Sequence, residues 1–140
     1  MSKNCAVILA AGEGKRMKAN KPKPMMEVLD RPMIDWVLDA VDASGVKDTI
    51  LVVGAYGEQL VDHCGDRSAI CWQKERLGTG HAVMMALDYL NASDAENVLI
   101  LNGDAPFMDA ATIAESLALH EANGNAVTVI SARLDEPFGY

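Results

Sequence analysis

The sequence contains few aromatic residues and few basic ones. Aromatic side chains make up 5% of its 140 residues, which disfavours a sandwich of aromatic-rich strands and suits helices packed on a parallel sheet of aliphatic strands. Lys and Arg number 12 against 20 Asp and Glu, for a net charge of −8. Nucleic-acid binding requires a basic surface that displaces counterions. We therefore expect no nucleic-acid partner.

Cysteines and long apolar runs are also scarce. The three cysteines, Cys5, Cys64 and Cys71, are odd in number and lack the spacing of a metal site. No apolar run approaches the roughly 20 residues that a membrane-spanning helix requires. No secretory leader is recognisable before the first apolar segment. We therefore expect no cysteine-held metal, no membrane partner and a cytoplasmic location.

The aliphatic residues that are present alternate between strand and helix patterns. Half of the residues are hydrophobic and 23% are charged, which indicates one globular unit. Short apolar runs predict strands over residues 5–11, 49–53, 69–73, 98–101 and 127–130. Prolines 22 and 24 exclude a regular helix from the long loop 12–30.

Helical spacing predicts a helix in each of four intervals between the strands. The residues expected to face inward in the first two are Ile34, Val37, Leu38 and Val41 after Pro32, and then Leu60 and Val61 within 57–63. In the other two they are Val83, Leu87 and Leu90 after Gly80, and Ile113 and Leu117 after an N-cap at Asp109. Strands alternating with helices predict a three-layer, Rossmann-like α/β fold with a mostly parallel sheet.

The most informative stretch joins the first predicted strand to a glycine loop and a basic cluster. Gly12 and Gly14 precede five of the twelve Lys and Arg residues, packed into nine positions: Lys15, Arg16, Lys18, Lys21 and Lys23. Glycines let backbone N–H groups approach phosphate oxygens, and cations neutralise the charge. The loop lacks Walker A spacing, and Met17 replaces the third glycine of the dinucleotide fingerprint. The stretch predicts a site for a phosphate-bearing ligand.

Two other polar motifs follow predicted strands. The run QKERLGTGHA covers residues 73–82, and Asn102-Gly103-Asp104 follows residues 98–101. Ligands of parallel α/β sheets bind beyond the carboxyl ends of the strands, so all three motifs are expected to meet there. Beside a nucleotide, an aspartate at a strand end suits Mg²⁺. Taken alone, Asp104 is more typical of a turn or a helix cap.

These motifs resemble those of a known family. Residues 9–17, LAAGEGKRM, followed by Pro22-Lys23, are similar to the signature of the sugar nucleotidyltransferases. The run at 73–82 resembles the base-reading segment of the bacterial bifunctional N-acetylglucosamine-1-phosphate uridylyltransferase/glucosamine-1-phosphate acetyltransferase (GlmU) family. Pro137 to Tyr140 resembles the start of that family's P-x-G-Y-G-R segment. Residues 1–140 then correspond to the nucleotide-binding front of the transferase domain, without the sugar-binding part or the trimerising acetyltransferase β-helix.

The resemblance implies a nucleotidyltransferase that moves UMP from UTP to N-acetylglucosamine 1-phosphate. Its products are pyrophosphate and UDP-N-acetylglucosamine, a precursor of cell-wall peptidoglycan. Arg16 would hold the departing phosphates, Lys23 would contact the α-phosphate, and Asp104 would ligate Mg²⁺, with the second metal ligand outside the chain. Asn102 departs from the tyrosine common in the family. The other implied nucleotide-binding residues are Leu9, Ala10, Ala11, Gly12, Gly14, Gln73, Gly78, Thr79, Asn102, Gly103 and Gly139.

Glutamine suits the base-reading role because its amide offers a donor and an acceptor, which match O4 and N3–H of uracil. His81 is expected to cap or pack, and Lys74 and Arg76 to be solvated. Two alternatives stay open. The enzyme could use another base or sugar, as UDP-glucose and dTDP-glucose pyrophosphorylases do. The 140 residues could also bind UTP without catalysis, because the sugar-binding part is missing.

Overall fold

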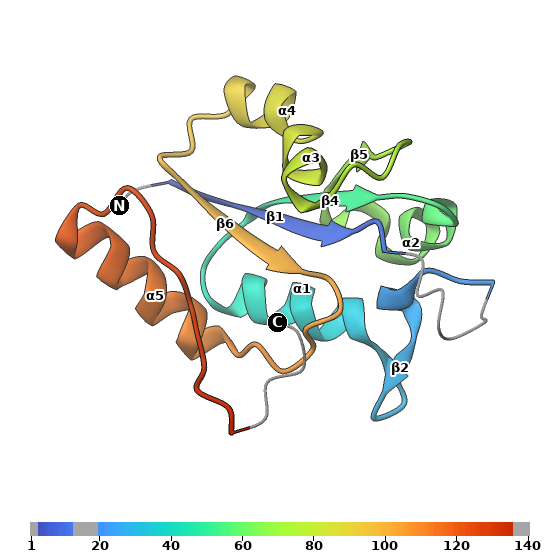
Figure 1. The fold of residues 1–140 in the computed structure, drawn as a ribbon, viewed down its shortest axis with the longest axis horizontal. Coiled ribbons are helices and arrows are strands. Elements are labelled where there is room, and N and C mark those ends of the chain that lie inside the picture. The colour runs from blue at the N-terminus through green and yellow to red at the C-terminus, as the bar shows by residue number, and fades with distance from the viewer. Residues whose placement is uncertain (1–2, 13–19, 136–140) are drawn as a thin grey trace.

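A four-stranded parallel sheet lies at the centre of the computed structural model, which describes residues 3–12 and 20–135. The strand order is β5-β4-β1-β6, shown in Figure 1. The strands are β1 (Asn4–Ala10), β4 (Asp48–Val53), β5 (Ala69–Trp72) and β6 (Asn97–Asn102). In the centre of the sheet Ile8 lies opposite Leu51 on one side and Leu101 on the other. Each strand begins and ends within one residue of its predicted bounds.

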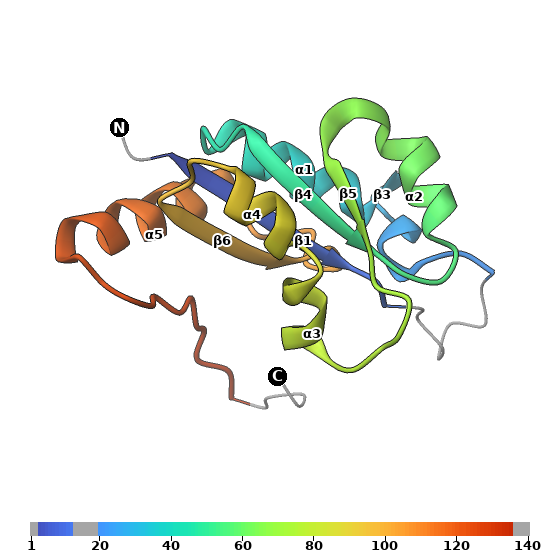
Figure 2. The same cartoon turned by 90° about the horizontal axis from the view of Figure 1, so that it is seen from above.

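Helices cover both faces of the sheet, as Figure 2 shows from above. On one face α1 (Met33–Ala43), α2 (Gly57–Cys64) and α5 (Ala110–Asn123) enclose the larger core. On the other face α3 (Thr79–Met84) and α4 (Leu87–Ala92) pack in a smaller apolar cluster. The predicted three-layer α/β fold is confirmed.

The larger core follows the predicted helical stripes. Four inward positions of α1 are buried, and so are Leu60 on α2 and Ile113 on α5. Val61 is half-buried. Asp109 caps α5 as predicted, because its carboxylate accepts a hydrogen bond from the Thr112 backbone N–H at 2.8 Å. None of the described helices combines the length and apolar character that crossing a bilayer requires.

The prediction for the segment after Gly80 is wrong in two respects. It forms two short helices, and its buried side chains are Ala82 and Ala86. Of the predicted inward residues, Leu87 is 42% exposed, whereas Leu90 is partly buried and packs against the smaller apolar cluster, as predicted. The small alanines let the helix backbone approach the sheet closely, so the inward stripe lies one position before the larger aliphatic residues.

The fifth predicted strand, residues 127–130, pairs with no strand in the described part of the chain. Val127 and Val129 are each 76% exposed. The segment is tied to the end of α5 instead, since Thr128 Oγ1 lies 2.9 Å from His120 Nδ1 and 3.1 Å from Asn125 Nδ2. A groove of about 520 Å³ separates it from β6. The residues have strand propensity, but no strand in residues 3–12 or 20–135 pairs with them.

The described part of the long loop after β1, residues 11–12 and 20–30, contains no α-helix, in agreement with the prediction from its prolines. Its described part holds a 3₁₀ turn, η2 (Lys23–Met25), and a small hairpin of β2 (Glu27–Val28) and β3 (Arg31–Pro32). Pro32 caps α1 and the helix begins at the next residue. The turn η2 places Lys23 beside the carboxyl end of β1, where its backbone N–H donates to the Gly12 carbonyl at 3.3 Å.

Candidate functional site

The carboxyl ends of β1, β5 and β6 border one cleft of about 300 Å³. It is lined by several residues singled out in the sequence: Leu9, Ala11, Gly12, Lys23, Gln73, Gly78, Thr79, Asn102 and Asp104. Three more lining residues were not predicted: Pro24, Arg76 and Ala82. Pro24 and Ala82 carry no chemical signal in a sequence. Arg76 is exposed, as expected, and also borders the cleft. Its place inside the QKERLGTGHA run was the one available signal.

Two of the predicted residues lie beneath the cleft. Ala10 is buried in the larger core. Gly103 donates its backbone N–H to the Leu9 carbonyl at 2.8 Å, and a Cβ at this position would lie 3.2 Å from both Leu9 O and Pro24 Cγ. A side chain there would push the ends of β1 and β6 apart, so Gly103 brings the two strand ends together. Gly14, Arg16 and Gly139 lie outside the described residues.

On one side of the cleft, which we call the phosphate corner, Lys23 and Asp104 form an ion pair. Lys23 Nζ lies 2.5 Å from Asp104 Oδ2, and the two side chains are 35% and 31% exposed. They are 81 positions apart in sequence. Loop geometry at the ends of β1 and β6 joins them. Among the described residues, the corner therefore brings together a cation and a carboxylate that are of opposite charge and remain accessible to solvent.

On the other side, which we call the base corner, Gln73 follows directly after β5. Its side chain is 5% exposed, the one buried polar side chain among residues 3–12 and 20–135. Its backbone N–H donates to the Val53 carbonyl at 2.8 Å, which extends the sheet ladder. Its amide Nε2 lies 3.2 Å from the Gly78 carbonyl oxygen and 2.9 Å from His81 Nδ1. This amide is held from two sides.

Gly78 closes the loop that returns to the amide of Gln73. Its φ of +105° lies in the region that L side chains rarely adopt, so glycine is required for the turn. A Cβ there would meet no atom within 4 Å. The constraint is therefore the backbone conformation and not lack of space.

A divalent cation fits the phosphate corner only with help from a ligand. No group of three or more His, Cys, Asp and Glu residues that could hold a metal occurs in the described part of the chain. Asp104 is the one carboxylate among the described residues that line the cleft. Mg²⁺ commonly binds one or two carboxylates together with substrate phosphates and water. The donor set suits a phosphate-bridged cation and not a site built of protein alone.

The cysteines lie outside the cleft lining and are poor nucleophiles. All three are free and buried. Burial raises the pKa of each thiol, with a neighbouring carboxylate adding to the effect, and the pKa of Cys64 reaches about 11. Each is therefore protonated at neutral pH. The cleft offers charge and hydrogen bonds, which suits chemistry without a covalent thiol intermediate.

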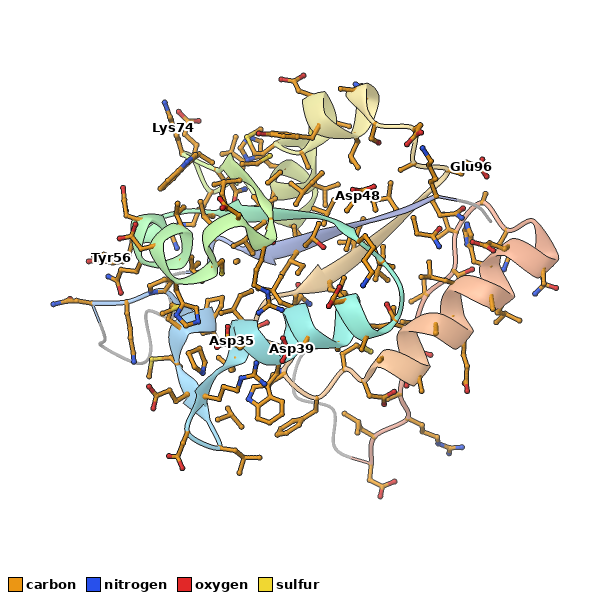
Figure 3. The ribbon with its side chains drawn as sticks, turned by 180° about the vertical axis from the view of Figure 1, so that it is seen from behind. Asp35, Asp39, Asp48, Tyr56, Lys74 and Glu96 are labelled. Carbon is orange, nitrogen blue, oxygen red and sulfur yellow. The ribbon has the colours of Figure 1, made fainter. Side chains whose placement is uncertain are left out.

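A second charged cluster lies on the α1 side of the molecule, away from the cleft. Figure 3 shows its two carboxylates, Asp35 and Asp39. Asp39 accepts from Arg31 at 2.5 Å and from Arg67 at 2.7 Å, and Asp35 Oδ1 lies 2.9 Å from His63 Nε2. Partial burial opposes ionisation of Asp39, but the two arginines outweigh it and lower its pKa. The cluster ties the β2–β3 hairpin and α2 to α1, which is a structural role.

Comparison with known proteins identifies the family of the chain. The chain belongs to the MobA-like NTP transferase family, whose domain matches residues 6–140. Within that class it is homologous along its length to the N-terminal part of bifunctional GlmU proteins. It is 46% identical over 140 residues to the protein of Heliobacterium modesticaldum, covering 100% of this chain and 30% of that protein. For the protein of Thermoanaerobacter pseudethanolicus the identity is 46% over 134 residues, with coverages of 96% and 29%. The chain thus spans about 30% of the length of these curated relatives.

Solved structures share the fold. Rv0371c from Mycobacterium tuberculosis H37Rv superposes with a TM-score of 0.73 at 22% identity, over 86% of this chain and 62% of that one. A complex of the same protein with manganese is known. A UDP-glucose pyrophosphorylase complexed with UDP-glucose gives a TM-score of 0.69 at 18% identity, over 89% and 55% of the two chains. At these identities the likeness establishes the fold alone.

Proposed function

We propose that this chain is the nucleotide-binding part of a uridylyltransferase, which transfers UMP from UTP to N-acetylglucosamine 1-phosphate. One observation carries the proposal: a single cleft has a buried, hydrogen-bonded glutamine at one corner and a lysine–aspartate pair at the other. The first suits a nucleobase edge and the second suits a metal-bound polyphosphate. Homology to bifunctional GlmU proteins supports the choice of uridine and of this sugar.

In the base corner, Gln73 would contact the uracil edge, with Gly78 and Thr79 beside it. Uracil has an N–H donor at position 3 between two carbonyl oxygens. A neutral amide in a buried setting discriminates well, because a base with the wrong edge leaves a polar group without a partner. The glycines at 78 and 80 leave room for the base plane next to the backbone.

In the phosphate corner, Lys23 would move from Asp104 to the α-phosphate. Asp104 would then hold Mg²⁺, which, when bound, neutralises phosphate charge and favours departure of pyrophosphate. A sugar-phosphate oxygen attacks the α-phosphorus in line, and the P–O bond to pyrophosphate breaks. Such a transfer requires positioning and charge neutralisation without a covalent protein intermediate. Arg16, outside the described residues, would hold the leaving phosphates.

The remaining parts of this proposal concern a longer protein. The relatives are about three times the length of this chain, so sugar recognition, a second metal ligand, trimer formation and cell-wall synthesis in the cytoplasm are proposed for that longer protein. A second candidate function belongs to the 140 residues alone. No strand among residues 3–12 and 20–135 pairs with the outer edge of β6, and a groove lies beside it, which supports a chain that binds UTP without completing the transfer.

Calorimetric titration with Mg²⁺ and each of UTP, CTP, dTTP and ATP tests the nucleotide part. We expect UTP to bind at least about tenfold more tightly than CTP or ATP, the gain typical of one matched polar contact. Equal affinities for the four nucleotides would refute the proposal.

Pyrophosphate release with UTP and N-acetylglucosamine 1-phosphate tests catalysis. Release by the 140-residue chain at a rate similar to that of a full-length relative would eliminate the binding-only alternative. UTP binding without release would support it. Release with glucose 1-phosphate in preference to the N-acetylated sugar would overturn the proposed acceptor.

A further inference from the structure

We infer that His81 is a positioning residue for base recognition: it fixes the Gln73 amide so that only the amide oxygen faces the ligand. The inference rests on the proposed uridine-nucleotide function and goes beyond it. It assigns a role to a histidine that the sequence suggested only as a cap or packing residue. Its basis is the set of contacts around one amide group.

The Gly78 carbonyl determines which way this amide points. A carbonyl oxygen only accepts hydrogen bonds, so the amide atom 3.2 Å from it has to be the nitrogen. The reversed amide would place two carbonyl oxygens at this distance with no proton between them. The orientation of Gln73 therefore follows from its surroundings and from hydrogen-bond chemistry.

That orientation in turn fixes the protonation of His81. An amide nitrogen donates and does not accept, so His81 Nδ1, 2.9 Å from it, has to supply the lone pair. The imidazole is then neutral and carries its proton on Nε2. His81 lies three residues after Gly78, on the first turn of α3, which places its ring and the Gly78 carbonyl on the same amide.

With both amide protons used, Gln73 has one group left for a ligand, the oxygen Oε1. No described residue donates to it, since the recorded partners of the side chain are Gly78 and His81 through Nε2. Oε1 also keeps contact with solvent. In residues 3–12 and 20–135 the one side-chain polar atom that is both fully buried and without a partner is Ser68 Oγ. Because Oε1 has no partner and is not that atom, it is not fully buried. A single acceptor thus faces the cleft.

A single fixed acceptor gives a selection rule for pyrimidines. Uracil N3 carries a proton and donates to Oε1, whereas cytosine N3 has a lone pair that Oε1 repels. A freely turning amide would accept both bases, because it could offer either its oxygen or its nitrogen. The partner for uracil O4 then comes from another group of the lining, such as the Gly78 backbone N–H. His81 thus restricts the Gln73 amide to accepting a hydrogen bond from the base.

The test compares two substitutions at position 81 by their ratio of UTP to CTP affinity. His81→Phe keeps an aromatic ring but removes the acceptor, and we expect the ratio to fall about tenfold. His81→Asn places an amide oxygen near the position of Nδ1, and we expect it to restore most of the ratio. Affinity for inorganic tripolyphosphate with Mg²⁺ should be unchanged in both, since the phosphate corner is untouched.

Nitrogen NMR of the unliganded chain provides a second readout. We expect a nitrogen shift typical of an unprotonated Nδ1, and Gln73 side-chain amide protons that exchange slowly with solvent and become fast in His81→Phe. A protonated Nδ1 in the neutral-pH protein would overturn the inference. An unchanged ratio of UTP to CTP affinity in His81→Phe would also overturn it. A loss of this ratio in His81→Asn as large as in His81→Phe would overturn it too, because it would point to ring packing. If the unsubstituted chain shows no preference for UTP, the proposed function itself fails and the inference with it.

Discussion

The two corners of the cleft are built on opposite principles. The base corner is centred on Gln73, a neutral and buried amide. Its N–H donors already bond to Gly78 and His81 before any ligand arrives, and its oxygen is left to accept from a ligand. The phosphate corner is charged and about one-third exposed, and Lys23 and Asp104 hold each other. Under the proposed function, we expect the base corner to keep its hydrogen bonds when a nucleotide binds and the phosphate corner to exchange its partners.

The physical reason is the free energy that each contact contributes. A buried hydrogen bond that is broken leaves an unsatisfied group, at a cost of about 1–3 kcal/mol. A partly exposed ion pair is worth about 0–1 kcal/mol, because water and salt screen it. Exchange in the phosphate corner therefore requires little free energy, while rearrangement in the base corner is resisted. Under the proposed function, selection of the base and binding of the phosphates therefore depend on separate groups.

The largest expected effect comes from Asp104→Asn. The substitution removes the carboxylate that would hold Mg²⁺, so the increase in UTP affinity that Mg²⁺ produces should fall by roughly 10–100-fold. Calorimetry with and without the metal measures this. Discrimination between UTP and CTP should persist, because the base corner is separate. If Asp104→Asn also abolished the discrimination between UTP and CTP, the two corners would act as one unit, which would contradict the comparison.

Gln73→Glu tests the base corner. One carboxylate oxygen would face the Gly78 carbonyl, so the Gln73 donation is lost and two acceptors oppose each other. We expect a destabilisation of about 1–3 kcal/mol, measured by urea unfolding, and loss of the preference for UTP. As a matched control, Lys74→Gln alters the next residue, whose side chain is exposed and points away from the ribbon in Figure 3. It should change neither property.

Lys23→Met tests the two roles of the lysine, which neutralises Asp104 in the unliganded chain and would contact the α-phosphate in the complex. Without it the Asp104 carboxylate is no longer neutralised, so Mn²⁺ alone should bind a few-fold more tightly, while UTP should bind about tenfold more weakly. Stability should change by less than about 1 kcal/mol. Lys47→Met removes the exposed ion pair to Asp42 and should affect neither ligand. Weaker Mn²⁺ binding in Lys23→Met would show that the pair does not compete with the metal.

The smallest effect is expected from the charged cluster on α1. The arginines lower the pKa of Asp39 below the unfolded value of about 3.8. The ionised carboxylate therefore stabilises the fold above that pH, and this contribution is lost as the pH falls through the lower folded pKa. Because the side chain is half-exposed, we expect less than about 1 kcal/mol. The urea stabilities of Asp39→Asn and the unsubstituted chain should converge as the pH falls through the folded pKa, below 3.8, and nucleotide binding at neutral pH should be unaffected.

The sequence predicted the fold well where burial alone determines it. The strand runs and the α1 stripe follow directly from apolar spacing, and the strand ends correctly brought residues 73 and 104 to one cleft. The α3–α4 segment was misread because alanine, a weak hydrophobic signal, occupies the buried positions. Residues 127–130 were misread because strand propensity does not say whether a partner lies nearby.

The residue types that line the cleft were predictable from the sequence, and their contacts were not. Glutamine, lysine and aspartate after strand ends indicate a nucleotide site. The pairing of Lys23 with Asp104 depends on how a 3₁₀ turn places a side chain 81 positions away, which no periodicity reveals. The same limit applies to Gln73: the sequence suggested an amide offering both a donor and an acceptor, whereas in the structure its donors are already used by Gly78 and His81.

A crystal structure of the chain with UTP and Mg²⁺ tests the central comparison most directly. The account predicts uracil in the base corner, with Gln73 Nε2 still bonded to the Gly78 carbonyl and His81 Nδ1, and Oε1 on uracil N3. It also predicts that Lys23 Nζ leaves Asp104 for the α-phosphate. A nucleotide bound with the Lys23–Asp104 pair intact, or with the Gln73 amide turned away from His81, would contradict it.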